Sequence, residues 1–202
     1  GCHANNSVDI QEFMIIPSNK FNFKDGLMKS VEVYTHLKNL LIEKGLSVSV
    51  GDEGGFAPNL KTSEEVLDLI ILSIERAGLI YLDDISIALD CAASELFNKD
   101  TYRLTGENKK YSSEEMIVYI QSLVDKYEIK SVEDPFDETD WNAWKTFTNN
   151  NKDLQIVGDD IFVTQEKILT KGIENKVANS ILIKLNQVGT LSETMQTISL
   201  AK

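Results

Sequence analysis

The chain has 202 residues, of which 42% are hydrophobic and 26% charged, an ordinary composition for a globular protein with one sizeable core. Its formal net charge of -12, without any cluster of lysine and arginine, argues against a nucleic-acid partner. No apolar run approaches the roughly 20 residues that span a bilayer, so we expect no membrane partner either.

The cysteines predict the cellular compartment of the protein, and the two ends of the chain predict whether it is part of a longer one. Cys2 and Cys91 show no paired spacing, which predicts a reducing compartment, the cytoplasm. The chain starts with Gly1 instead of methionine, and Lys202 falls inside a helical pattern. We therefore expect an excerpt of a longer protein.

The first part of the chain predicts a strand and two helices. A strand candidate over 9–17 is followed by a helix that Gly45 ends. The apolar stripe expected for this helix contains Leu27, Val31, Tyr34, Leu37 and Leu41. The segment 48–50 then leads into a glycine-rich loop, 51–59. Thr62 and Glu65 then resemble a capping box that opens a helix ending at Gly78.

From residue 85 onward strands and helices alternate regularly. We expect strands over 85–90, 129–133, 154–159 and 180–186, and helices over 112–127, 141–147, 166–176 and from 190 onward. A hairpin-like segment lies around 99–109. Strands that alternate with helices predict a parallel sheet, either an open doubly wound sheet or a (β/α) barrel.

The stretch from Ser180 to Thr190 places one lysine, Lys184, in an apolar and β-branched run. In a strand, Lys184 shares a face with Leu182 and Asn186. A lysine buried in this way is costly unless it is paired or functional. The alternative is an edge-strand lysine whose ammonium group reaches water.

Three other predicted strands end in an acidic residue: Asp90, Glu133 and Asp159. The carboxyl ends of parallel strands meet at one rim, where α/β active sites lie. Strand alternation directs these side chains to the same side, and Lys184 lies near the end of the next strand with matching parity. Taken singly, each acid could equally be a helix N-cap or a loop residue.

Three carboxylates at one rim repel one another unless a cation lies among them. Oxygen ligands without histidine or cysteine suit Mg²⁺, or Mn²⁺, better than zinc. A metal held in this way can take a substrate carboxylate and stabilise the charge that forms when the α-proton leaves. Beside a divalent cation the charged form of Lys184 is disfavoured, so this lysine can act as a base.

The glycine-rich loop 51–59 brings a further acid, Glu53, to a place where the backbone can approach a ligand closely. A glutamic acid there could protonate a leaving hydroxide. The loop lacks the glycine and lysine pattern of nucleotide-binding loops, so nucleotide binding is not predicted. A flexible turn would explain the loop about as well.

Five blocks of sequence closely resemble the enolase (phosphopyruvate hydratase) family, in the same order along the chain. The blocks are 51–59 (GDEGGFAPN), 88–95 (ALDCAASE), 131–138 (SVEDPFDE), 157–164 (VGDDIFVT) and 182–190 (LIKLNQVGT). The segments 3–7 (HANNS) and 9–14 (DIQEFM) are similar to this family as well. A lysine base with Mg²⁺ is the pattern already described for the enolase superfamily.

The resemblance implies a glycolytic lyase that reversibly dehydrates 2-phospho-D-glycerate to phosphoenolpyruvate with Mg²⁺. It implies a cytoplasmic homodimer, or a higher homo-oligomer, with some family members also found at the cell surface or secreted. Lys184 would be the base and Glu53 the acid. The other implied roles are Mg²⁺ ligation by Asp90, Glu133 and Asp159, and substrate contacts by His3, Gln11 and Glu12.

Enolases have an amino-terminal α+β domain and an eight-stranded barrel whose second strand is antiparallel. Against that pattern, residues 1–202 form one partial catalytic barrel domain. The amino-terminal domain, the first barrel strand and the last two would be missing, together with the arginine, serine and second lysine that hold phosphate and carboxylate. We therefore expect the 202 residues alone to be inactive.

Two other functions are weighed against this one. Another member of the superfamily would act on a different carboxylate acid and keep the metal acids, but it would lack the intact loop 51–59. Alternatively, the excerpt is a non-catalytic fragment with a binding role only.

Overall fold

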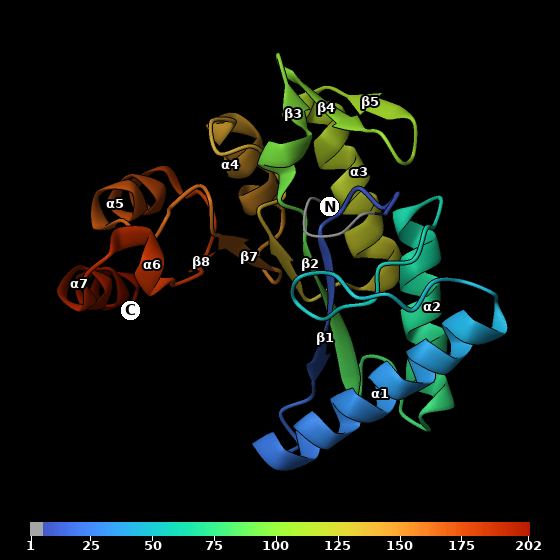
Figure 1. Cartoon of the computed structure of the whole chain (residues 1–202). Coiled ribbons are helices and arrows are strands. Elements are labelled where there is room, and N and C mark those ends of the chain that lie inside the picture. Colours follow the sequence, from blue (N-terminus) through green and yellow to red (C-terminus); the bar gives the residue numbers. More distant parts are fainter. Residues whose placement is uncertain (1–5) are drawn as a thin grey trace.

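The structure is a computed structural model that describes residues 6–202, and its centre is a five-stranded sheet (Figure 1). The strand order is β1-β2-β6-β7-β8. The strands are β1 (Glu12–Pro17), β2 (Ile85–Asp90), β6 (Ser131–Glu133), β7 (Gln155–Gly158) and β8 (Ser180–Ile181). β1 runs antiparallel to β2, and every later neighbour is parallel. The described sheet stays open, with β1 and β8 as its edges.

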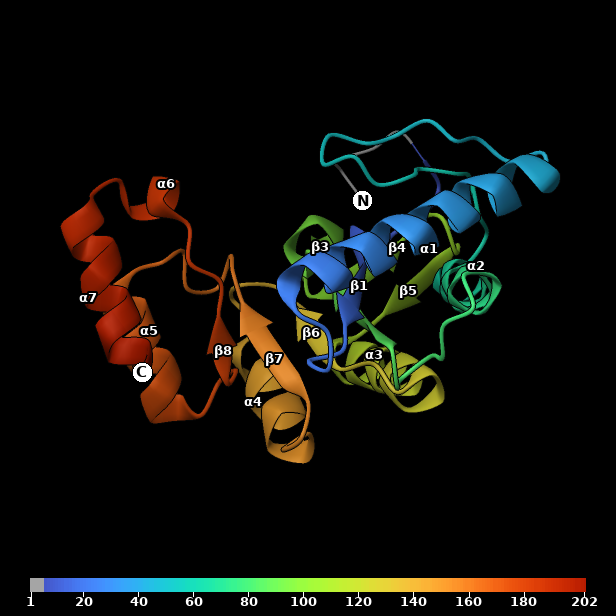
Figure 2. The same cartoon turned by 90° about the horizontal axis from the view of Figure 1, so that it is seen from below.

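Helices follow the strands as the alternating pattern predicts. They are α1 (Phe23–Glu43), α2 (Ser63–Arg76), α3 (Ser113–Tyr127), α4 (Trp141–Asn150), α5 (Glu166–Asn175), α6 (Leu185–Val188) and α7 (Leu191–Ala201). Figures 1 and 2 show α1 and α2 at the β1 end of the sheet and α5, α6 and α7 together at the β8 end. No helix among the described residues is both long and apolar enough to cross a membrane.

A small antiparallel sheet takes the place of the predicted hairpin. It consists of β3 (Phe97–Asn98), β4 (Thr101–Leu104) and β5 (Lys109–Tyr111), preceded by a 3-10 helix, η1 (Ala93–Leu96). In Figure 1 it lies at the end of α3, beyond the carboxyl ends of the central strands. Within the segment that leads into and through loop 51–59, an isolated antiparallel bridge joins Val50 to Phe56.

Side chains at the helix starts explain where the helices begin. Ser112 and Glu115 form a full capping box at α3. At α2 the predicted box forms only in part: the Thr62 hydroxyl accepts from the Glu65 N–H, while the Glu65 carboxylate accepts from the N–H of Lys61. Each cap satisfies a backbone N–H that has no partner inside the helix.

The apolar stripe predicted for α1 is largely wrong. Leu27 and Val31 are 53% and 55% exposed, and Tyr34 is 40% exposed. The buried residues of this helix are instead Gly26, Val33, Leu40 and Leu41. The helix carries apolar residues on two neighbouring faces, and periodicity cannot tell which of them the sheet and α2 will cover.

A polar cluster fastens the small sheet to the rest of the fold. The Asp9 carboxylate accepts hydrogen bonds from the N–H groups of Gly106 and Glu107, at 2.9 and 3.0 Å. One Glu107 oxygen accepts from the Ser63 N–H and from the Tyr119 hydroxyl, both at 2.9 Å. The Glu107 side chain is only 4% exposed. The cluster therefore joins the start of the chain to the start of α2 and to the middle of α3.

Glu107→Gln should lower the free energy of unfolding by about 1–3 kcal/mol at pH 7. Burial acts to raise the pKa of Glu107, but hydrogen bonds from Lys109, Ser63 and Tyr119 outweigh it and lower that pKa below 4.5. A lowered folded pKa adds stability above the unfolded pKa, and this stability is lost as pH falls through the folded value. Urea unfolding at pH 7 and pH 3 measures the difference in free energy of unfolding between wild type and Glu107→Gln, and this difference should be smaller at pH 3. Glu75→Gln, at an exposed position, is the control. An equal difference at both pH values would contradict this assignment.

Candidate active site

The three predicted acids follow or end neighbouring parallel strands. Asp90 ends β2 and is paired in register with Glu133, which ends β6. Glu133 is paired in turn with Val157 on β7, and Asp159 follows two residues later, which gives it the same side of the sheet by alternation. Asp90 and Asp159 are buried, and Glu133 is partly buried. The open sheet thus places these carboxylates along one rim.

The electrostatics of the rim show an excess of negative charge. Burial, reinforced by the charges of Asp90 and Asp159, raises the pKa of Glu133 to about 8. Burial also raises the pKa of Asp90, although the Ala92 N–H and the Gln11 amide donate to its carboxylate at 3.0 and 3.2 Å. Acids whose charged forms are this unfavourable, with oxygen as the only donor atom, fit a hard divalent cation.

Lys184 reaches this rim, but not as predicted. The strand expected over 180–186 is only Ser180–Ile181, and Lys184 lies beyond it as the N-cap of α6. Its side chain is 50% exposed, which agrees with the alternative of a lysine that reaches water and not with burial, while its ammonium group is bonded to Asp159. Burial acts to lower the pKa of Lys184, but the hydrogen bond with Asp159 and the other nearby acids raise it overall.

A second group of acids overlaps the predicted set. Asp134, Asp159 and Asp160 each offer an oxygen within 4.8 Å of the others and could hold a metal ion. The two Asp134 oxygens, however, accept the N–H groups of Asp159 and Asp160, at 2.9 and 2.8 Å. Burial, partly opposed by these two bonds, raises the pKa of Asp134 to about 7.

Asp134 had no predicted role, and its contacts indicate what it does. Both of its oxygens hold the backbone of the turn that carries Asp159, so it orients one predicted ligand. The residue itself has a left-handed backbone, with φ at 40°. The only hint in the sequence is its place directly after Glu133, which also fits an ordinary loop aspartate.

The turn after β7 also depends on a glycine. A Cβ added at Gly158 would lie 2.5 Å from the Phe162 ring and 2.6 Å from Ile161. Gly158→Ala must therefore displace the turn that carries Asp159, and we expect it to lower the free energy of unfolding by about 1–3 kcal/mol. Thermal unfolding measures this loss, with Gly55→Ala as the control, since a Cβ there meets nothing within 4 Å. A Gly158→Ala protein as stable as wild type would show that the turn adjusts freely.

The glycine-rich loop 51–59 is held by a backbone bond of its own and by contacts with Tyr34 of α1, and it carries the exposed Glu53. The Gly51 N–H donates to the Gly55 carbonyl at 2.9 Å, and the Tyr34 hydroxyl donates to the Gly54 carbonyl at 2.8 Å. The Tyr34 ring stacks on Phe56 with the ring centroids 4.2 Å apart. The conformation of the loop is thus held by α1.

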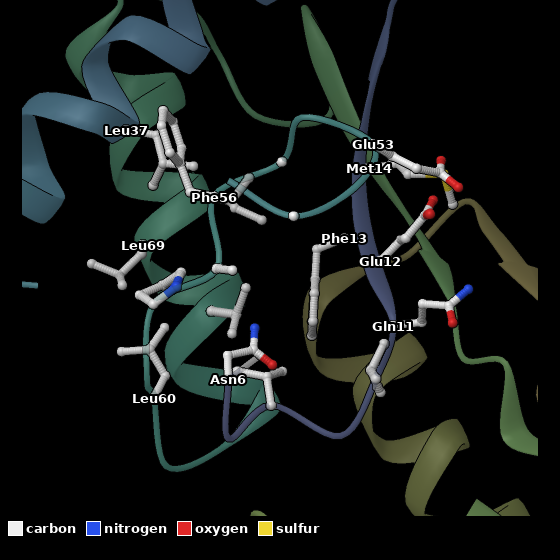
Figure 3. A pocket seen from close by; sticks show the side chains of 18 of the residues that line it. Asn6, Gln11, Glu12, Phe13, Met14, Leu37, Glu53, Phe56, Leu60 and Leu69 are labelled. Carbon is white, nitrogen blue, oxygen red and sulfur yellow. The ribbon is translucent and has the colours of Figure 1, made fainter. Parts of the chain in front are cut away.

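Glu53 shares a pocket of about 310 Å³ with the two other described substrate candidates, Gln11 and Glu12. Figure 3 shows the three polar side chains on one side of β1 and apolar ones such as Phe56 and Leu69 on the other. Gln11 connects this pocket to the acid rim, since its amide donates to Asp90. His3 lies outside the described residues.

Comparison with known families agrees with this geometry. The family model described as "Enolase, C-terminal TIM barrel domain" matches residues 1–202, the whole chain. The chain belongs to this family. Its fold is thus the enolase-type (β/α) barrel, present in the described residues as an incomplete, five-stranded part with helices around it. As an enolase-superfamily barrel domain it carries an aspartate group compatible with a metal ion, Asp134, Asp159 and Asp160.

Proposed function

We propose that residues 1–202 are the partial catalytic barrel domain of an enolase, which reversibly dehydrates 2-phospho-D-glycerate to phosphoenolpyruvate. This proposal rests on the contact between Lys184 and Asp159, which lies beside two acids with raised pKa values, Asp90 and Glu133. The family supplies the barrel, and the intact loop 51–59 favours this substrate over another carboxylate acid. The complete enzyme would be a cytoplasmic homodimer or a higher homo-oligomer.

Asp90, Glu133 and Asp159 would hold Mg²⁺, because these residues end or follow adjacent strands and their three carboxylates face the single ammonium group of Lys184. A bound Mg²⁺ would bind the substrate carboxylate and neutralise the acids that now raise the pKa of Lys184. Asp134 would keep its oxygens on the backbone N–H groups of the neighbouring turn. The pKa of Glu133, raised to about 8, is the expected property of an acid group built for a cation.

Lys184 would take the proton from the carbon next to the substrate carboxylate. Its half-exposed side chain is accessible to a substrate, and the Asp159 carboxylate holds the ammonium nitrogen at the acid rim. A lysine base needs its neutral form, so proton removal depends on lowering the pKa that the surrounding acids hold up. In this proposal Asp159 would position Lys184, and the bound cation would favour the neutral form that a base needs.

Glu53 would donate the proton to the hydroxide that leaves from the neighbouring carbon. It lies on a loop held by Tyr34 and lines the same pocket as Gln11 and Glu12. Those two side chains, with His3, would contact the substrate. Base and acid would then approach the substrate from different segments of the chain, which the elimination of water across two adjacent carbons requires.

Phosphoenolpyruvate absorbance after addition of 2-phosphoglycerate and Mg²⁺ tests the proposal. The full-length protein that contains this chain should turn over, and the 202 residues alone should not, because the described sheet is open at β1 and β8. Failure of the full-length protein to form phosphoenolpyruvate would refute the proposal. Turnover by the 202 residues would show instead that they are sufficient, and binding of 2-phosphoglycerate without turnover by either protein would favour a binding role only.

A further inference from the structure

The turn that leads from β7 to α5 contains backbone strain beside the proposed site. Val163 and Thr164 both have left-handed backbones, with φ at 42° and 55°. β-Branched residues rarely adopt this conformation, which costs each of them about 1–2 kcal/mol. Thr164 is completely buried, so the strain is held in place by its surroundings. Strain that a fold retains next to a reactive group suggests a functional constraint.

The Thr164 hydroxyl uses the strained position to make two hydrogen bonds. It accepts from the backbone N–H of Lys184 at 2.9 Å and donates to the Gln187 side-chain carbonyl at 2.6 Å. The Thr164 backbone carbonyl accepts from the Thr197 hydroxyl at 2.8 Å, which anchors the turn to α7. One buried hydroxyl therefore holds both the backbone of Lys184 and the side chain of Gln187.

Gln187 completes a closed ring of contacts. Its side-chain N–H donates to one Asp159 oxygen at 2.6 Å, while the Lys184 ammonium is bonded to the other oxygen. The ring thus runs from Thr164 to Gln187, to Asp159, to Lys184 and back to Thr164. Every contact in it joins residues 20 to 28 positions apart in the chain.

We propose that Thr164 and Gln187 are positioning residues that hold Lys184 and Asp159 in the geometry for proton removal. The ring joins the proposed base to a proposed metal ligand through one buried hydroxyl, so its geometry sets where the Lys184 ammonium group lies relative to Asp159. This inference rests on the proposed role of Lys184 as the base. Misplacement of a catalytic group by about 1 Å can lower a rate about 100-fold.

The test compares Thr164→Val with Thr164→Ser in the full-length protein. Valine keeps the β-branched shape but removes the hydroxyl, whereas serine keeps the hydroxyl. We expect valine to lower the kcat for exchange of the 2-phosphoglycerate α-proton in D₂O about 10- to 100-fold with KM changed less than about threefold, and serine to stay within about threefold of wild type. Thr170→Val, an exposed threonine of α5, is the matched control.

A second measurement needs neither substrate nor metal. Hydrogen exchange of the backbone amides over 182–188 should be faster in metal-free Thr164→Val and unchanged in Thr164→Ser, because only valine removes the acceptor of the Lys184 N–H. Gln187→Met, which keeps side-chain length on a half-buried residue, should lower kcat in the same direction as Thr164→Val. Gln187→Met therefore tests the positioning roles even if Thr164→Val does not fold.

The outcomes separate this inference from the proposed function. The positioning roles are overturned if Thr164→Val or Gln187→Met keeps the wild-type kcat, or if Thr164→Ser is as slow as Thr164→Val. In that case the proposed function still stands if Lys184→Ala abolishes exchange. Exchange that persists in Lys184→Ala overturns the proposed function itself. A loss of kcat in Thr164→Val with rescue by serine supports the inference.

Discussion

Lys184→Ala in the full-length protein should lower the rate of α-proton exchange at least about 1,000-fold, because it removes the group that takes the proton. Glu53→Gln should leave this exchange near the wild-type rate and block formation of phosphoenolpyruvate. The two substitutions act on different steps, since Lys184 contacts Asp159 at the rim and Glu53 lies on the loop above β1. NMR of 2-phosphoglycerate in D₂O measures exchange, and absorbance measures dehydration.

Lys167→Ala is a suitable control for this experiment, because it removes an exposed lysine of α5. If Glu53→Gln abolished exchange as completely as Lys184→Ala, the two roles would be wrongly assigned. If Lys184→Ala kept wild-type exchange, another group would be the base.

Glu133→Gln should stabilise the metal-free protein at high pH but weaken its binding of Mg²⁺. The folded pKa of Glu133 is raised to about 8 from 4.5, so the folded protein retains a proton that the unfolded chain releases. Wild-type stability therefore falls as pH rises through this window, and the loss is complete above pH 8. Discounted for partial exposure, we expect the metal-free variant to be about 1–2 kcal/mol more stable than wild type at pH 9 and similar to it below about pH 4.

Loss of the Glu133 charge should weaken Mg²⁺ binding about 10- to 100-fold in calorimetric titration, and the metal should then raise the unfolding temperature of the variant less than that of wild type. Glu138→Gln, an exposed acid on the following loop, should change neither property. Unchanged Mg²⁺ affinity in Glu133→Gln would remove this residue from the ligand set.

Local patterns predicted the strand endings better than the helix faces. Asp90 and Glu133 end β2 and β6 as predicted, because a short, mostly apolar run predicts a buried strand and the acid marks where that run stops. For α1 the same reasoning failed: Leu27, Val31 and Tyr34 are exposed, since the helix has apolar residues on two faces. Which face is covered depends on the path of the chain between α1 and α2.

The sequence also could not predict how the site is held together. The predicted strand around Lys184 ends at Ile181, opposite the last residue of β7, Gly158, and the Lys184 N–H donates to the Thr164 hydroxyl. In the sequence, Asp134 and Gln187 resemble ordinary loop and helix residues, so no role is predicted for either. No local spacing signals these contacts, because each depends on two turns meeting in space.

The sequence by itself determined the alternation of strands and helices, the family, and the acids and lysine brought to one rim. These follow from residue periodicity and from motifs that lie within single segments. Only the tertiary structure decided that the two oxygens of Asp159 contact Lys184 and Gln187. It also decided that Asp134 holds the turn that carries Asp159. The physical reason is that hydrogen bonds need atoms placed within a few tenths of an ångström, and packing between distant segments sets that placement.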